Sequence, residues 1–295
     1  MMMWNCTQSL QPPPRQEHSH EEEFPSVTAI IPFHKWARRD AILQAITSVV
    51  QQTYRGRVET IVVDTSNDPH AYELDSVPFA RPVHVLHTNP PPGTWAGYPR
   101  NIGIRNATTE YVAFLDSDDV WFPTKLDLQF QFMKLYNQYD FVASDSVSPL
   151  RCRLIYHPNG SSTWTDWTID ELLVSPWTHA ERFQKFMGKK PMTKLHHHHS
   201  PVLDGASLPA IFDSDLVEWH NVAATSSVMI RRSMLMDHQV GLFNETRNHG
   251  EDYDLWKRIM RIKGMRMGFL SRPTIALDYA CHGGAGTKYG KKATD

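Results

Sequence analysis

Three carboxylates in one short stretch are the residues of this chain best suited to chemistry. Asp116, Asp118 and Asp119 directly follow the apolar run 111–115, which is typical of a buried strand. A hard divalent cation such as Mg²⁺ or Mn²⁺ takes oxygen ligands, and carboxylates two residues apart at a strand end can share one ion or its water shell. Aspartate is also common in turns, so the same residues are compatible with an ordinary turn and helix cap.

A second carboxylate, Asp64, ends another apolar run at 60–63. Together with the run 27–31 and the helical spacing over 40–52, these segments alternate strand and helix. This alternation predicts an α/β fold with a mainly parallel sheet and right-handed crossovers. Ligands bind beyond the carboxyl ends of such strands, so Asp64 and Asp116 are expected at the same edge of the sheet.

The remaining expected elements are less regular. The sequence predicts a weaker strand at 83–86, a loop rich in proline and glycine at 89–98, a short helix at 101–107 and a helix capped by Thr124. Further along, it predicts a strand at 226–230, a helix beginning near Glu251 and strand-like runs over 265–281.

Five short motifs, in order along the chain, resemble those of the family 2 glycosyltransferases with the GT-A fold. They are Ile30-Ile31-Pro32 with Ser48-Val49-Val50-Gln51-Gln52-Thr53-Tyr54, Ile61-Val62-Val63-Asp64, Pro99-Arg100-Asn101-Ile102-Gly103, Phe114-Leu115-Asp116-Ser117-Asp118-Asp119, and Gly250-Glu251-Asp252-Tyr253-Asp254-Leu255-Trp256. The resemblance covers residues 25–145 and 220–285 and implies a Rossmann-like sheet flanked by helices, with an inserted irregular segment on the acceptor side. It departs after Pro32, where the family often has Thr-Tyr-Asn and this chain has Phe33-His34-Lys35.

The resemblance implies a role for each matched residue. Asp64 is expected to accept hydrogen bonds from the nucleobase. Asp118 is expected to bind the metal ion, Mn²⁺ or Mg²⁺, with Asp116 near the ribose and the metal. Asp252 is the expected general base, with Glu251 beside it. The other candidates are Pro32, His34, Arg100, Asn101 and Ser117 for donor binding, and His282 as a further metal ligand.

Three of these assignments have plainer alternatives. Arg100 suits a diphosphate contact, where a fixed cation helps the leaving group, but it suits an exposed ion pair equally well. Glu251 and Asp252 also fit ordinary acids at a helix N-terminus, which complement the helix dipole. A lone histidine such as His282 is often structural.

Aromatic residues supply the candidates for the acceptor side. The flat C–H faces of sugars stack on aromatic rings, which favours Trp95, Trp177 and Trp219, with His220 beside the last of them. Packing in the core is the commoner fate of tryptophan.

The length of 295 residues suits one large domain with a full core. The expected organisation is a disordered leader at 1–24, a single catalytic domain at 25–285 and a tail at 286–295. Within the domain we expect a nucleotide-sugar-binding half at 25–145, an inserted segment at 146–220 and an acceptor and catalytic half at 221–285.

Composition excludes several function classes. With 30 basic and 32 acidic residues the net charge is -2, so nothing in it favours nucleic acid as a partner. No apolar run approaches the roughly 18 residues of a membrane span, and the N-terminus lacks the apolar core of a secretory signal. We therefore expect a cytoplasmic enzyme without an integral membrane segment, and the sequence leaves its oligomeric state open.

The expected activity is an inverting, metal-dependent transfer of a sugar from a nucleoside-diphosphate sugar, with UDP as the expected nucleotide, to a hydroxyl of a glycan or glycoside acceptor. One alternative is a nucleotidyltransferase acting on a sugar phosphate, although no glycine-rich phosphate loop with a lysine lies near the first strand. Another is a catalytically inactive carbohydrate-binding module.

Overall fold

The computed structural model describes residues 24–34, 39–67, 69–136, 140–147, 154–156, 162–164, 211–212, 217, 221, 223–262 and 265–277. Several predictions fall outside these residues. They are the leader up to residue 23, the tail 286–295, most of the inserted segment 146–220, and the candidates Trp177, Trp219, His220 and His282.

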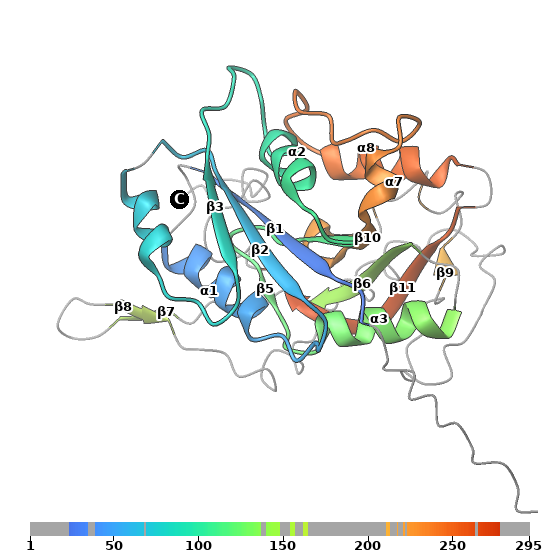
Figure 1. Cartoon of the computed structure of the whole chain (residues 1–295), viewed down its shortest axis with the longest axis horizontal. Helices are drawn as coiled ribbons and strands as arrows, with labels where there is room; N and C mark the ends of the chain where they lie inside the picture. Colours follow the sequence, from blue (N-terminus) through green and yellow to red (C-terminus); the bar gives the residue numbers. More distant parts are fainter. Residues whose placement is uncertain are drawn as a thin grey trace, which may run out of the picture.

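One sheet joins both halves of the described chain (Figure 1). Nine described strands form it in the order β3-β2-β1-β4-β10-β6-β11-β5, with β9 paired to β11. Their bounds are β1 Val27–Phe33, β2 Val58–Asp64, β3 Val83–His87, β4 Tyr111–Phe114, β5 Val120–Trp121, β6 Phe141–Val147, β9 Ile211–Phe212, β10 Met229–Arg231 and β11 Met267–Ala276. A separate pair joins β7 (Leu154–Tyr156) to β8 (Ser162–Trp164).

The first half of the sheet is parallel, as the strand and helix alternation predicts. Strands β3, β2, β1 and β4 pair in parallel, and so do β6 and β11. Strand β10 runs antiparallel to both β4 and β6, and β5 and β9 run antiparallel to β11. The second half of the sheet is therefore mixed.

Helices cover both faces of the sheet (Figure 1). On one face lie α1 (Arg39–Val50) and α3 (Lys125–Tyr136); on the other lie α2 (Gly97–Asn106), α7 (Arg232–Met236) and α8 (Glu251–Met260). Alternation within β1 divides the core, since Ile30 packs towards α2 and α8 while Ala29 and Ile31 pack towards α1. Two short 3-10 helices, η1 (Pro69–Ser76) and η2 (Thr225–Ser227), complete the described elements.

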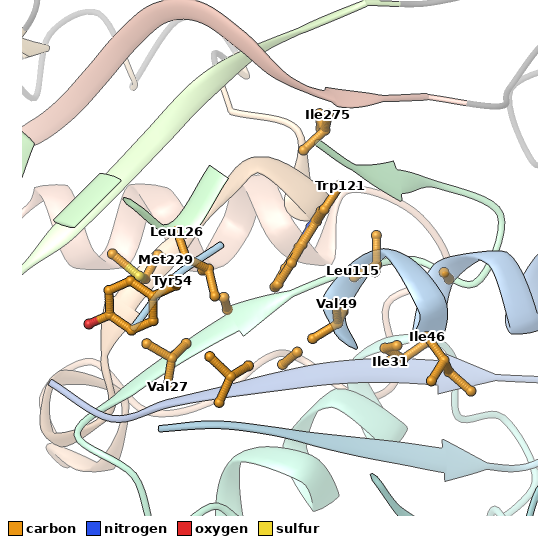
Figure 2. Packing of buried hydrophobic residues seen from close by; sticks show 14 of the residues in the cluster. Val27, Ile31, Ile46, Val49, Tyr54, Leu115, Trp121, Leu126, Met229 and Ile275 are labelled. Carbon is orange, nitrogen blue, oxygen red and sulfur yellow. The ribbon is translucent and has the colours of Figure 1, made fainter. Parts of the chain in front are cut away.

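The core beneath α1 and α3 is built from large side chains. Figure 2 shows part of this cluster, with Ile46 and Val49 of α1 facing β1 and Trp121 between α1 and β11; each of these side chains is buried. Burial of a full side chain of this size contributes about 1.5–3 kcal/mol relative to leaving it exposed. Phe24, which the sequence placed in the leader, packs edge-on against Tyr54 with ring centroids 5.7 Å apart.

Two of the elements that the sequence predicts have different bounds or a different type in the structure. The predicted helix 101–107 begins instead at Gly97, because proline is tolerated in a first helical turn, where its missing N–H has no partner to lose. The predicted strand 226–230 is replaced by η2 followed by β10. In η2 the hydroxyl of Ser227 donates to the carbonyl of Ala224, and such local bonds compete with a strand ladder.

None of the helices in the described part of the chain combines the length and the apolarity that crossing a membrane requires.

Candidate active site

The carboxyl ends of the parallel strands bring the predicted donor residues to one edge of the sheet. In the strand register Phe33 lies opposite Asp64, and Asp64 lies opposite His87. Beyond β4, the N–H of Leu115 donates to the carbonyl of Ile30, so Asp116 follows directly at the same edge. The structure therefore confirms the prediction that Asp64 and Asp116 lie at the same edge of the sheet.

Asp64 is buried and already holds two partners. One carboxylate oxygen accepts the backbone N–H of Ser66 at 2.8 Å, and the other lies 2.9 Å from Nδ1 of His87. The second ring nitrogen of His87 lies 3.1 Å from Asp75. Burial lowers the pKa of His87, but its hydrogen bonds with Asp64 and Asp75 outweigh this effect and raise the pKa above its ordinary value. These contacts fix the Asp64 carboxylate at the end of β2.

Residues 116–119, called here the acidic turn, are closed by a bond from the N–H of Asp119 to the carbonyl of Asp116 at 3.1 Å. The three carboxylates have different surroundings. Asp119 is buried and accepts the hydroxyl of Ser226 at 2.5 Å, whereas Asp116 and Asp118 are partly exposed. The structure thus separates Asp119, which is buried and anchors the turn, from Asp116 and Asp118, which keep partial exposure.

The residues of the acidic turn fit a divalent cation that arrives with a diphosphate. Burial raises the pKa of Asp118 to about 6, and the negative charge of Asp116 adds to the shift, while the charge of Arg100 opposes it. Among the described residues, no group of three or more His, Cys, Asp or Glu side chains forms a complete metal cage. One or two carboxylates completed by substrate phosphates are, however, a common way to hold Mg²⁺.

Arg100 of α2 joins the acidic turn to the helix α8. Its Nη2 donates to Asp116 at 2.5 Å and its Nη1 donates to Glu251 at 2.5 Å. The side chain is 4% exposed, so the exposed ion pair considered from the sequence is wrong. Burial would lower the pKa of this guanidinium, but the charges of Asp116 and Glu251 outweigh it and raise the pKa. Arg100 therefore stays charged, with its guanidinium 5.5 Å from the ring centre of Phe243.

The predicted catalytic acids lie at the N-terminus of α8. Gly250 precedes them with a φ of 70°, a left-handed conformation that favours glycine, and it orients the first turn. Glu251 is buried against Arg100, while Asp252 is half-buried. The Asp252 carboxylate accepts the hydroxyl of Thr225 at 3.0 Å and the amide of Asn221 at 3.3 Å. The two acids sit where a helix dipole favours them, and each also has a specific partner.

The other donor candidates occupy different environments. Asn101 is buried, and its side chain bonds the backbone of Phe243 and the carboxylate of Glu245, which ties the loop before α8 to α2. Ser117 is buried within the acidic turn, and Pro32 lies within β1. His34 follows β1, where partial burial lowers its pKa and the charge of Asp116 opposes that shift.

Among the acceptor candidates, Trp95 is described and is 47% exposed. Its backbone N–H donates to the carbonyl of Glu245 at 2.8 Å, which places this tryptophan beside the loop that leads into α8. The roles assigned to Trp177, Trp219, His220 and His282 stay predictions.

Sequence reasoning missed several side chains that contact the candidate residues, and three of them hold proposed donor, metal or base residues. These three are His87, Thr225 and Ser226. The sequence does carry a signal for His87, since it ends a strand next to β2. Thr225 and Ser226 gave none, because they adjoin an apolar run that suggests a strand.

Comparisons with known proteins agree with this geometry. Residues 28–195 match the profile of the family described as Glycosyl transferase family 2. An uncharacterized glycosyltransferase of Rickettsia felis is 24% identical over 238 residues, which cover 81% of this chain and 32% of that protein. The Escherichia coli protein WfgD, a UDP-Glc:alpha-D-GlcNAc-diphosphoundecaprenol beta-1,3-glucosyltransferase, is 30% identical over 112 residues, covering 36% of this chain and 43% of WfgD.

Solved structures share the fold. TarS of S. aureus in complex with UDP-GlcNAc superposes with a TM-score of 0.55 at 16% identity, covering 86% of this chain and 58% of that chain. The complex of TarS with UDP gives a TM-score of 0.54. The chain thus spans about a third of the Rickettsia protein and less than two thirds of the TarS chain. The mixed sheet with helices on both faces and the match over 28–195 lead to one conclusion: the chain belongs to glycosyl transferase family 2 and has the GT-A fold.

Proposed function

We propose that this protein is an inverting, metal-dependent glycosyltransferase that moves a sugar from a UDP-sugar to a hydroxyl of a glycan or glycoside acceptor. The observation that carries the proposal is the Arg100 bridge, which brings Asp116 of the acidic turn and Glu251 of α8 onto one guanidinium. The bridge thereby ties the acidic turn to the N-terminus of α8, where Glu251 is followed by the proposed base Asp252.

The donor half of the proposal rests on Asp64 and the acidic turn. Asp64 is held at a strand end with a carboxylate that can accept an N–H of a nucleobase. Asp116 and Asp118 would hold Mn²⁺ or Mg²⁺, and when bound the cation would offset the charge of the departing diphosphate. The choice of a uridine nucleotide is supported by relatives, since WfgD is named for UDP-Glc and TarS has been solved with UDP and UDP-GlcNAc.

Arg100 contributes a fixed positive charge next to Asp116. Because the guanidinium is buried and held by two carboxylates, it needs no reorientation during the reaction. Its bonds to Asp116 and Glu251 keep both carboxylates in place. Arg100 thus organises the site, and its charge favours the anionic leaving group.

Proton transfer is assigned to Asp252. An acceptor hydroxyl attacks the anomeric carbon as its proton passes to the Asp252 carboxylate, and the bond to the diphosphate breaks on the opposite side. The products are the glycosylated acceptor and a nucleoside diphosphate, with the anomeric centre inverted. The hydrogen bonds from Thr225 and Asn221 hold the Asp252 carboxylate in place. Glu251 is held by Arg100, so we assign it a supporting role.

A nucleotidyltransferase is disfavoured because residues 28–195 match a glycosyltransferase family.

A panel of nucleotide sugars tests the proposal directly. Each donor is mixed with the full chain and MnCl₂, and thermal stabilisation of the protein is recorded. Hydrolysis of the donor is followed by the nucleoside diphosphate that it releases. We expect stabilisation and slow release with a UDP-sugar and no effect in EDTA. Release of pyrophosphate from a sugar phosphate and a nucleoside triphosphate would instead indicate a nucleotidyltransferase.

A further inference from the structure

The 3-10 turn η2 contacts both the acidic turn and the proposed base, although the sequence assigned it no role. Two consecutive residues make these contacts: Thr225 bonds the proposed base, and Ser226 bonds the acidic turn. Both are buried, at the junction between β4, β10 and the N-terminus of α8.

Ser226 holds the acidic turn through a hydroxyl that serves as donor and acceptor at once. Its Oγ donates to the carboxylate of Asp119 at 2.5 Å and accepts the backbone N–H of Asp116 at 2.9 Å. These bonds join the first and last residues of the turn, so the backbone that carries Asp118 is fixed between them. Ser226 is 1% exposed, which leaves its hydroxyl shielded from competing water.

Thr225 holds the base. Its Oγ1 donates to Oδ2 of Asp252 at 3.0 Å, while the backbone N–H of Tyr253 donates to the other oxygen at 2.6 Å. The carboxylate is thereby restrained at both oxygens. Thr225 of η2 supplies the shorter of the two side-chain bonds, since the amide of Asn221 donates to the same oxygen at 3.3 Å.

The turn itself is anchored to the core. The indole N–H of Trp121 donates to the carbonyl of Ser226 at 2.9 Å, and the amide of Gln129 donates to the carbonyl of Ser227 at 2.7 Å. Trp121 and Gln129 are both fully buried. Since η2 cannot shift without breaking these bonds, the hydroxyls of Thr225 and Ser226 occupy fixed positions.

We propose that Thr225 and Ser226 are a pair of positioning residues, Ser226 setting the metal-binding geometry of the acidic turn and Thr225 setting the orientation of Asp252. This inference rests on the proposed function of the site. It predicts separable defects: loss of the Ser226 hydroxyl weakens binding of the cation with the nucleotide, and loss of the Thr225 hydroxyl slows turnover without weakening donor binding.

The test uses four substitutions in the full chain. Ser226→Ala and Thr225→Val remove one hydroxyl each, and Thr225→Ser restores a hydroxyl at the second position. Ser227→Ala is the matched control, because the Ser227 hydroxyl bonds within the turn to Ala224. Thermal unfolding is recorded for each variant. Binding of UDP in MnCl₂ is measured by calorimetry, and kcat and KM are measured with the UDP-sugar that the wild type hydrolyses.

We expect Ser226→Ala to raise the Kd for UDP in MnCl₂ by about 10–100-fold, the usual cost of losing a residue that orients a metal ligand. Thr225→Val should lower kcat by about 10–100-fold with an unchanged KM, and Thr225→Ser should restore it. Ser227→Ala should match the wild type in both measurements.

The inference is overturned if Ser226→Ala binds UDP in MnCl₂ like the wild type, or if Ser227→Ala is equally impaired. It is also overturned if Thr225→Ser is as slow as Thr225→Val, since a bond from the hydroxyl is then not what matters. If Ser226→Ala fails to fold, the kcat values of Thr225→Val and Thr225→Ser decide whether the inference stands. A wild type that neither binds UDP with Mn²⁺ nor hydrolyses a UDP-sugar would overturn the proposed function itself, which is a distinguishable result.

Discussion

Arg100 and Glu251 are 151 positions apart in the sequence, yet Nη1 of Arg100 donates to Oε1 of Glu251 at 2.5 Å. The other arm of the guanidinium holds Asp116. One buried cation thus pairs with two carboxylates, one from each half of the fold. This arrangement makes the placement of both carboxylates depend on the same side chain.

Replacing Arg100 should therefore destabilise the protein strongly. Arg100→Ala leaves Asp116 and buried Glu251 without their shared cation, and breaking a buried pair in this way costs about 3–5 kcal/mol. Arg100→Lys keeps the charge but loses the planar fork that reaches both carboxylates. Urea unfolding measures the loss. The control is Arg105→Ala on the same helix, since Arg105 is 51% exposed and its pair with Glu245 is worth about 1 kcal/mol or less. Equal losses for Arg100→Ala and Arg105→Ala would contradict this account.

Asp252→Asn should separate turnover from binding. The amide cannot accept a proton, so kcat for a UDP-sugar should fall by about 100-fold or more, while calorimetry should show unchanged binding of UDP in MnCl₂. Asp254→Asn is the matched control because Asp254 lies in the same helical turn and pairs with Arg258 at 3.1 Å. Full activity of Asp252→Asn would remove Asp252 as the base.

His87 should make stability depend on pH. Its pKa is raised in the folded protein, so it contributes stability that is fully present below its unfolded pKa of about 6.5 and is lost as pH rises through the folded value. The difference in free energy of unfolding between the wild type and His87→Gln should therefore be larger near pH 5.5 than near pH 9. Denaturant titrations at the two pH values measure it, with His84→Gln from the same strand as the control. A difference that grows with pH would reverse the assigned sign.

Gly103 is predicted to be required for the close approach of α2 to β1. A methyl group at this position would collide with the side chain of Ile30, which is fully buried. Gly103→Ala should cost about 1–3 kcal/mol, the usual range for overpacking a core. In an Ile30→Ala background the same substitution should cost less, because space is then available. An equal cost in both backgrounds would mean that this contact is not the reason for glycine.

The strands that position the site could be predicted from the sequence because they are buried on both faces and read as continuous apolar runs. Strands β1, β2 and β4 were predicted in this way. The position of Asp64 and Asp116 at one edge of the sheet follows from these strands. Strand β6 was missed because Ser144, Asp145 and Ser146 interrupt its pattern. Ser144 is satisfied inside the sheet by a 2.5 Å bond to Thr274 of β11, a partner that no local pattern reveals.

The same limit applies within the site. The residue types at Arg100, Glu251 and Asp252 were visible as motifs, but their partners come from distant parts of the chain. The bonds from Thr225 and Ser226 depend on a 3-10 turn that the sequence did not predict, since a strand was expected from Ser226 onwards. The local hydrophobic pattern predicts helices and strands. The contacts between the site residues, by contrast, follow from the topology of the whole sheet.

The most direct test of the central claim is a calorimetric titration of UDP into the wild type and into Asp118→Ala, each in MnCl₂ and in EDTA. If the acidic turn holds the cation that binds the diphosphate, the wild type binds UDP in MnCl₂, and this binding is lost in EDTA and in Asp118→Ala. Equal affinity with and without the cation, or binding by Asp118→Ala that matches the wild type, would contradict the account.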